Sequence, residues 1–130
     1  MNIEKLKKSK KGFTLVEIIV VLVIIAILAA IAIPAMTGWI DRANKKTVLA
    51  EARTVLLAAQ TIASEEYGVD GSVAAADVDT GEVESLAGVA ADTVSGIAVT
   101  SSGQITAVIY DDGNYTATYN GSTWVVADSE

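Results

Sequence analysis

Residues 13–40 read FTLVEIIVVLVIIAILAAIAIPAMTGWI, and this stretch decides the fold. Glu17 is its one charged side chain, and the apolar run Ile18–Ile33 follows directly. As a helix, these 28 residues would be about 42 Å long, which exceeds the bilayer hydrocarbon core of about 30 Å. The stretch therefore predicts a helix that can cross a membrane.

The residues before this stretch are strongly basic. Residues 1–12 contain five lysines and one acid, Glu4, so the positive-inside rule places the amino terminus in the cytoplasm. An ordinary secretory signal peptide shares these features, and Ala30-Ile31-Ala32 would supply a small-residue cleavage site. However, the apolar run is longer than such a signal needs, and it contains a costly carboxylate. We therefore favour a different processing event.

The rest of the chain has the opposite character. The 130 residues have a net charge of −7 and a mean hydropathy of +0.45, yet residues 54–130 hold twelve carboxylates and neither Lys nor Arg. Without Cys or His there are no disulfides, thiolate metal sites or histidine bases, and an acidic surface disfavours nucleic acid. We expect no enzyme, no catalytic residue, no cofactor and no direct nucleic-acid binding.

Glu17 needs an explanation, since an unpaired carboxylate is costly in an apolar segment. A cut between Gly12 and Phe13 would give Phe13 an α-ammonium, with Glu17 four residues further on the same helical face. The same cut would remove all five lysines and leave a chain with a net charge of −11. Residues 10–17, KKGFTLVE, with the long apolar helix behind them, closely resemble the class III signal of type IV prepilins.

This resemblance covers roughly residues 5–67 and implies a role for several residues. A membrane-embedded prepilin peptidase would cut after Gly12 and N-methylate Phe13. Glu17 would neutralise the amino terminus of an adjacent subunit, which would also fix axial register. Pro34 matches a helix-distorting proline of such subunits, and it should kink or locally melt the helix because it lacks an N–H.

The predicted fold class is α+β and type IV pilin-like, with a long amino-terminal helix packed on a small antiparallel sheet. Gly68 and Gly71 are predicted stop signals for the helix, beyond Tyr67. The predicted segments begin with a cleaved leader (1–12), a transmembrane or filament-core helix (13–40) and the amphipathic half of the same helix (41–67). A loop-rich connector (68–92) and a β-meander (93–130) follow, and the connector is expected to contain one helical turn at 84–88. The apolar stripe of the amphipathic half comprises Val48, Leu49, Ala52, Val55, Leu56, Ala59, Ile62 and Ala63. Strands are expected at 93–100, 104–110, 115–119 and 123–127, separated by Gly- and Asn-containing turns.

All basic residues of the processed chain lie at the start of the amphipathic half: Arg42, Lys45, Lys46 and Arg53. They would contact either anionic lipid headgroups or the acidic surfaces of neighbouring subunits. Both interpretations stay open, since they can apply at different stages.

Asp77, Asp79 and Glu84 form a weaker candidate, a calcium site, because hard cations bind carboxylate oxygens. Their spacing does not match an EF-hand loop, and solvated acidic loops are much commoner. We favour the solvated loop and expect no metal.

The leading hypothesis is a structural subunit, the major pilin of a type IV pilus, which would serve adhesion, motility or biofilm formation. Its partners would be other copies in a helical homopolymer, prepilin peptidase, the membrane before assembly, and an assembly machinery with an inner platform protein and an ATPase that acts indirectly. It would reside in the cytoplasmic membrane as a precursor and then in an extracellular filament. The alternative is a pseudopilin of a type II secretion or competence system. A third hypothesis is a bitopic protein whose acidic ectodomain binds ions or a ligand without polymerising.

Overall fold

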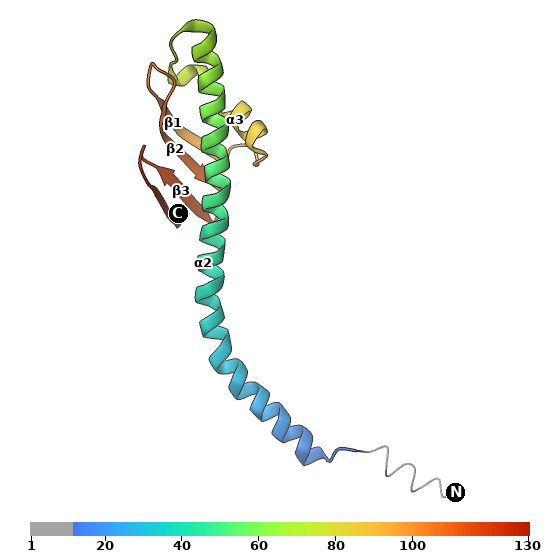
Figure 1. The fold of residues 1–130 in the computed structure, drawn as a ribbon. Helices are drawn as coiled ribbons and strands as arrows, with labels where there is room; N and C mark the ends of the chain where they lie inside the picture. The colour runs from blue at the N-terminus through green and yellow to red at the C-terminus, as the bar shows by residue number, and fades with distance from the viewer. Residues whose placement is uncertain (1–11) are drawn as a thin grey trace, which may run out of the picture. The chain divides into compact units, whose positions relative to one another are not determined.

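The computed structural model describes residues 12–130, so the predicted leader lies outside the described residues apart from Gly12 (Figure 1). The elements in chain order are α2 (Leu15–Asp70), η1 (Ala75–Asp77), α3 (Thr80–Ala87), β1 (Val94–Val99), β2 (Ile105–Asp111), β3 (Tyr115–Tyr119) and β4 (Trp124–Asp128). A long helix followed by a small antiparallel sheet confirms the predicted α+β, pilin-like arrangement. The chain divides into two compact units, Met1–Asp41 and Arg42–Glu130.

The described part of the first unit is almost entirely the start of α2. The helix begins at Leu15, two residues after the predicted start, and continues through Pro34 without interruption. Local melting at Pro34 is therefore not observed. An 18-residue window of α2 has a mean hydropathy of 3.3 with none of it buried, so the helix is long and apolar enough to cross a membrane.

In the second unit, the buried face of α2 packs in one core with the four-stranded sheet. Its buried side chains recur every three or four residues, as the sequence pattern predicts. They are Val48, Ala52, Val55, Ala58, Ala59, Ile62 and Ala63. Four of the seven are alanines, which lets the helix backbone approach the strands closely. From the sheet, Ile105, Val108, Tyr110 and Ala117 are among the residues that complete this core.

The sheet is an antiparallel meander in the order β1-β2-β3-β4. Pairing is regular between β2 and β3 and between β3 and β4, whereas the register between β1 and β2 shifts twice between Ser95 and Val99. Gly96 lies in this irregular stretch at φ +62°, where a Cβ would come within 2.8 Å of the Ile109 side chain. The buried residues of β2 are Ile105, Val108 and Tyr110, so buried and less buried positions do not alternate strictly along this strand. The register shifts between β1 and β2 explain why the spacing of the buried residues changes along β2.

Residues 68–92 contain more regular structure than the expected loop-rich connector. α2 continues past the predicted stop at Gly68 and ends at Asp70, directly before the other predicted stop, Gly71, which has φ +71°. α3 occupies eight residues rather than a single turn. Asp79 caps α3 by accepting a hydrogen bond from the Glu82 N–H, and Gly88 ends it in the left-handed conformation. These caps explain why so short a segment is helical.

Three hydrogen bonds fasten β2 and the turn before it to α2. The Gln60 side chain donates to the Gly103 carbonyl over 2.6 Å and accepts from the Ile105 N–H over 3.1 Å. The Tyr110 hydroxyl donates to the Glu51 carboxylate over 2.7 Å. Burial and this hydrogen bond raise the pKa of Tyr110, because both disfavour the phenolate form.

Candidate processing and assembly site

α2 begins with a reciprocal pair of hydrogen bonds between Thr14 and Glu17. The Glu17 N–H donates to the Thr14 hydroxyl, and the Thr14 N–H donates to Oε2 of Glu17, both over 3.3 Å. This capping box satisfies N–H groups that the first helical turn leaves without backbone partners. A carboxylate in the first turn is also favoured by the helix dipole. Glu17 therefore has a local stabilising partner within its own chain.

The sequence motif does contain the signal for this capping box. A Thr followed three residues later by Glu, directly before an apolar run, is a helix-start pattern. Thr14 was not among the site residues predicted from the sequence, although this pattern includes it.

The predicted cleavage point lies just before the helix. Gly12, Phe13 and Thr14 have non-helical backbone, Phe13 is 77% exposed, and a Cβ at Gly12 would meet nothing within 4 Å. The Gly12–Phe13 peptide bond is therefore sterically open in the described part of the chain. A cut there would leave a new α-ammonium at the helix start, beside the turn that carries Glu17.

Pro34 lies in the apolar part of α2, where it leaves the Ala30 carbonyl without its usual N–H partner. Three residues further on, the Thr37 hydroxyl lies 2.8 Å from the Pro34 carbonyl oxygen and 3.2 Å from that of Ile33. Thr37 thereby directs its polar group back to the helix backbone, and the outer surface of this segment stays apolar.

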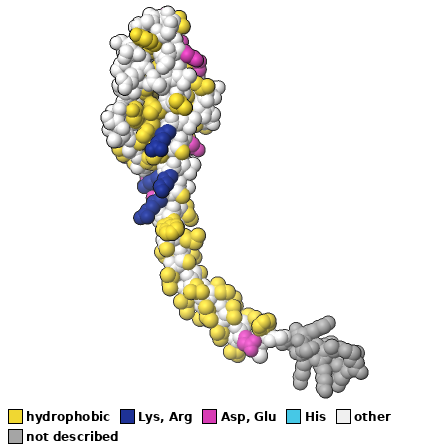
Figure 2. Space-filling model, in the orientation of Figure 1, with side chains coloured by type: hydrophobic (Ala, Val, Ile, Leu, Met, Phe, Trp, Pro, Cys, Tyr) yellow, Lys and Arg dark blue, Asp and Glu magenta, His cyan; other side chains and the backbone are white. Residues whose placement is uncertain are grey.

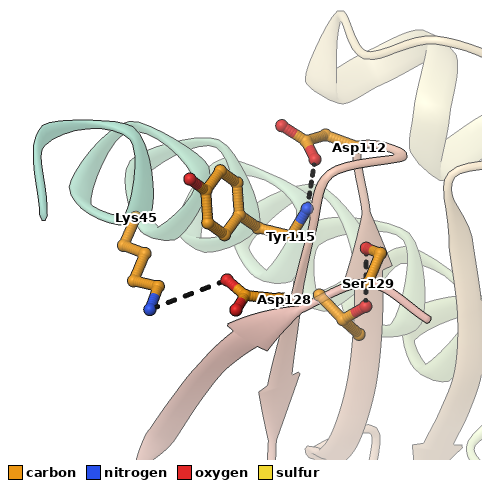
Figure 3. A network of polar contacts seen from close by, with 6 residues as sticks. Lys45, Asp112, Tyr115, Asp128 and Ser129 are labelled. Carbon is orange, nitrogen blue, oxygen red and sulfur yellow. Dashed lines mark hydrogen bonds and ion pairs between the residues drawn. The ribbon is translucent and has the colours of Figure 1, made fainter. Parts of the chain in front are cut away.

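The four basic residues of the amphipathic half separate into two kinds. Lys45 makes contacts within its own unit. Its ammonium lies 3.7 Å from Oδ1 of Asp128 and 5.9 Å from the centre of the Tyr115 ring (Figure 3). Among residues 12–130, no hydrogen bond or ion pair is formed by the side chains of Arg42, Lys46 and Arg53. Lys45 therefore ties β4 to α2, whereas the other three cations remain available to partners outside the chain.

These three cations form one stripe on α2. At about 100° per residue, Arg42, Lys46 and Arg53 fall within about 40° of one another around the helix axis. Figure 2 shows the Lys and Arg side chains gathered on one face of the second unit, next to hydrophobic side chains. Arg42 and Arg53 are about 16 Å apart along the axis, whereas one headgroup layer is about 5–8 Å thick. The stripe is therefore longer than one headgroup layer is thick.

The carboxylates of the calcium hypothesis each bind backbone N–H groups. Asp77 accepts from Ala74 and Asp79 from Glu82. Glu84 is only 7% exposed, and its Oε1 accepts from both Thr93 and Val94 over 2.9 Å. No group of three or more His, Cys, Asp or Glu side chains suited to a metal ion is found in residues 12–130. Glu84 instead positions the start of β1.

A family model described as the prokaryotic N-terminal methylation motif matches residues 7–33. Comparison with curated proteins gives no match, and comparison with solved structures gives none either. The matched residues include Gly12, Phe13 and Glu17, and they extend through most of the apolar part of α2.

The chain therefore carries the class III signal of type IV pilins and pseudopilins, as its resemblance to prepilins predicts. Together with the pilin-like fold, the motif implies a type IV pilin or pseudopilin, which is a structural class of protein. It also implies processing by prepilin peptidase and assembly into type IV filaments from a membrane-anchored precursor.

Proposed function

We propose that this chain is the major structural subunit of a type IV pilus, an extracellular filament for adhesion, motility or biofilm formation. This proposal rests on the methylation motif and on the apolar helix that follows it. The most apolar 18 residues of this helix contain no buried residue. Such a surface is stable in lipid, and after extraction it needs other apolar helices around it. A helical homopolymer supplies them.

In this proposal, prepilin peptidase cuts after Gly12 and methylates Phe13. The Glu17 carboxylate then pairs with the Phe13 ammonium of an adjacent subunit, exchanging or sharing its hydrogen bond to Thr14. A subunit in the wrong axial register would leave two charges unpaired in an apolar core, so the pair selects the register. Pro34 would allow the helix to bend during packing, and the inner platform protein and ATPase would drive subunit addition.

The experiment is intact-mass analysis of the chain from its native cells, combined with electron microscopy of sheared surface material. We expect a chain that begins at N-methylated Phe13 and forms long filaments outside the cell. An uncut amino terminus would contradict the proposal. Processed chains confined to short filaments within the envelope would favour the pseudopilin alternative.

Glu17→Gln is the sharpest variant, because glutamine can keep the capping box while losing the charge. We expect normal cutting after Gly12 but at least about a tenfold loss of filaments, since the neighbouring ammonium lacks its counter-charge. Filament yield equal to wild type would refute the charge pair.

A further inference from the structure

The outer face of α2 carries an exposed leucine with a hollow on each side. Leu57 is 67% exposed. Next to the sheet lies a shallow cleft of about 340 Å³ with walls that include Leu56, Leu57, Ile105 and Tyr119, and Arg53 also lines it. Next to α3 lies a groove of about 240 Å³ bordered by Leu57, Ala58 and Leu86. Arg53 and Leu57 are one helical turn apart, so a cation and an apolar side chain lie side by side.

The polar groups around these hollows are mostly occupied. Gln60 is bonded to Gly103 and Ile105, and the hydroxyls of Thr54 and Thr61 donate to carbonyls of their own helix. The Arg53 guanidinium has no hydrogen bond or ion pair within residues 12–130. This face therefore suits a carboxylate that is accompanied by an apolar side chain.

α3 presents that combination with the same spacing. Glu82 and Leu86 are also one helical turn apart, Leu86 is 57% exposed, and the exposed Glu82 carboxylate has no partner among the described residues. Because both pairs have an i, i+4 spacing of about 6 Å, the two charges and the two leucines can meet simultaneously.

The charge balance of the second unit points to the same contact. Residues 42–130 carry four basic and thirteen acidic side chains, so two such units repel each other. A contact that pairs opposite charges between copies has to use one of these few cations, and Lys45 is already bound to Asp128. Of the remaining three, Arg53 is the one that lines the cleft.

We propose that Arg53 and Leu57 of one copy bind Glu82 and Leu86 on α3 of a second copy. The contact rests on the proposed filament function and assigns one head-to-head interface within it. Within one chain Leu57 and Leu86 border the same groove, so the two patches adjoin, with Arg53 on the side of the cleft next to the sheet.

Charge exchange in the full chain, produced in its native cells, tests the contact. R53E and E82R should each lower filament yield about tenfold, because each places like charges together. The double variant R53E/E82R should return to within about twofold of wild type, since the charges again match. The matched control R53E/E65R has the same net charge but should not recover, because Glu65 lies on exposed α2 surface outside both patches. Equal recovery in both doubles, or recovery in neither, would overturn the contact.

A second measurement does not depend on yield. The chain has no cysteine, so R53C/E82C introduces the two thiols of interest alone. Mild oxidation of isolated filaments should give disulfide-linked multimers, whereas R53C/E65C should stay monomeric. Monomers from R53C/E82C filaments would overturn the contact while leaving the filament function intact. A wild-type chain that is never cut or never polymerises would instead overturn the proposed function and this contact with it.

Discussion

At the scale of single residues, Asp111 fastens the carboxy-terminal end of the chain. Its Oδ1 accepts from the Ser129 hydroxyl over 2.7 Å and from the Gly113 N–H over 2.8 Å, and Oδ2 accepts from Thr116 over 3.2 Å. The Ser129 hydroxyl is the main reason that the pKa of Asp111 lies below its ordinary value, and the Gly113 N–H adds to it. One carboxylate thus joins the end of β2, β3 and the residue after β4.

This network predicts a contribution to acid sensitivity. A lowered folded pKa means that the stabilisation is fully present above the unfolded pKa of about 3.9 and is lost as the pH falls through the lower folded value. Ser129→Ala removes the hydrogen bond that contributes most to the lowered pKa of Asp111. The melting temperature of the variant should therefore fall less than that of wild type between neutral pH and the region below pH 4. Circular dichroism of the full chain in detergent measures this, with Ser122→Ala as the turn-serine control. Parallel pH profiles for Ser129→Ala and wild type would contradict it.

Residues whose role is local could be predicted from the sequence, and residues with distant partners could not. Gly12, Phe13 and Glu17 lie within six residues, so their pattern is visible in the chain itself. Glu84 binds N–H groups nine and ten residues away across an irregular segment. Its carboxylate was therefore open to a calcium interpretation, although its contacts are those of a buried structural group.

At the scale of elements, the turn between β1 and β2 is held against α2. Gly103 has φ +86°, and a Cβ there would lie 3.2 Å from the Ala63 carbonyl oxygen and 3.3 Å from Cβ of Tyr67. Its own carbonyl accepts from Gln60. Strand positions were predictable because turn residues separate the strands, but this packing was not, since it depends on residues some forty positions apart.

Substitution at this turn separates backbone strain from packing. Gly103→Ala should lower the free energy of unfolding by about 2–3 kcal/mol, because it adds a crowded Cβ to an unfavourable positive φ. Gly113→Ala is the matched control, since Gly113 has φ +95° with nothing within 4 Å of an added Cβ. It should cost only about 1 kcal/mol for the backbone. Denaturant titration of both variants measures the difference, and equal losses would show that the turn does not press on α2.

At the scale of the whole molecule, the sequence divides between two environments. Residues 13–40 have one charged side chain, whereas residues 54–130 have twelve carboxylates and no cation. This division was evident from composition alone, and the fold assigns its acidic part to α3, the strands, their connections and the end of α2. The contacts of individual cations were not evident, because Lys45 meets Asp128 only after β4 has been folded back onto α2.

The same division predicts how the proposed filaments respond to salt. Each processed subunit would carry a net charge of −11, with the acidic heads outside, so neighbouring filaments should repel. The screening length falls from about 30 Å at 0.01 M salt to about 8 Å at 0.15 M, which removes most repulsion between separate surfaces. Isolated filaments should therefore bundle as NaCl is raised over this range, as measured by light scattering and electron microscopy. Glu65→Gln with Asp70→Asn removes two exposed charges and should shift bundling to lower salt, because less repulsion remains to be screened. Sucrose of equal osmolarity should have no such effect. If the degree of bundling changed neither with NaCl concentration nor with these substitutions, the acidic charge would not govern the spacing between filaments.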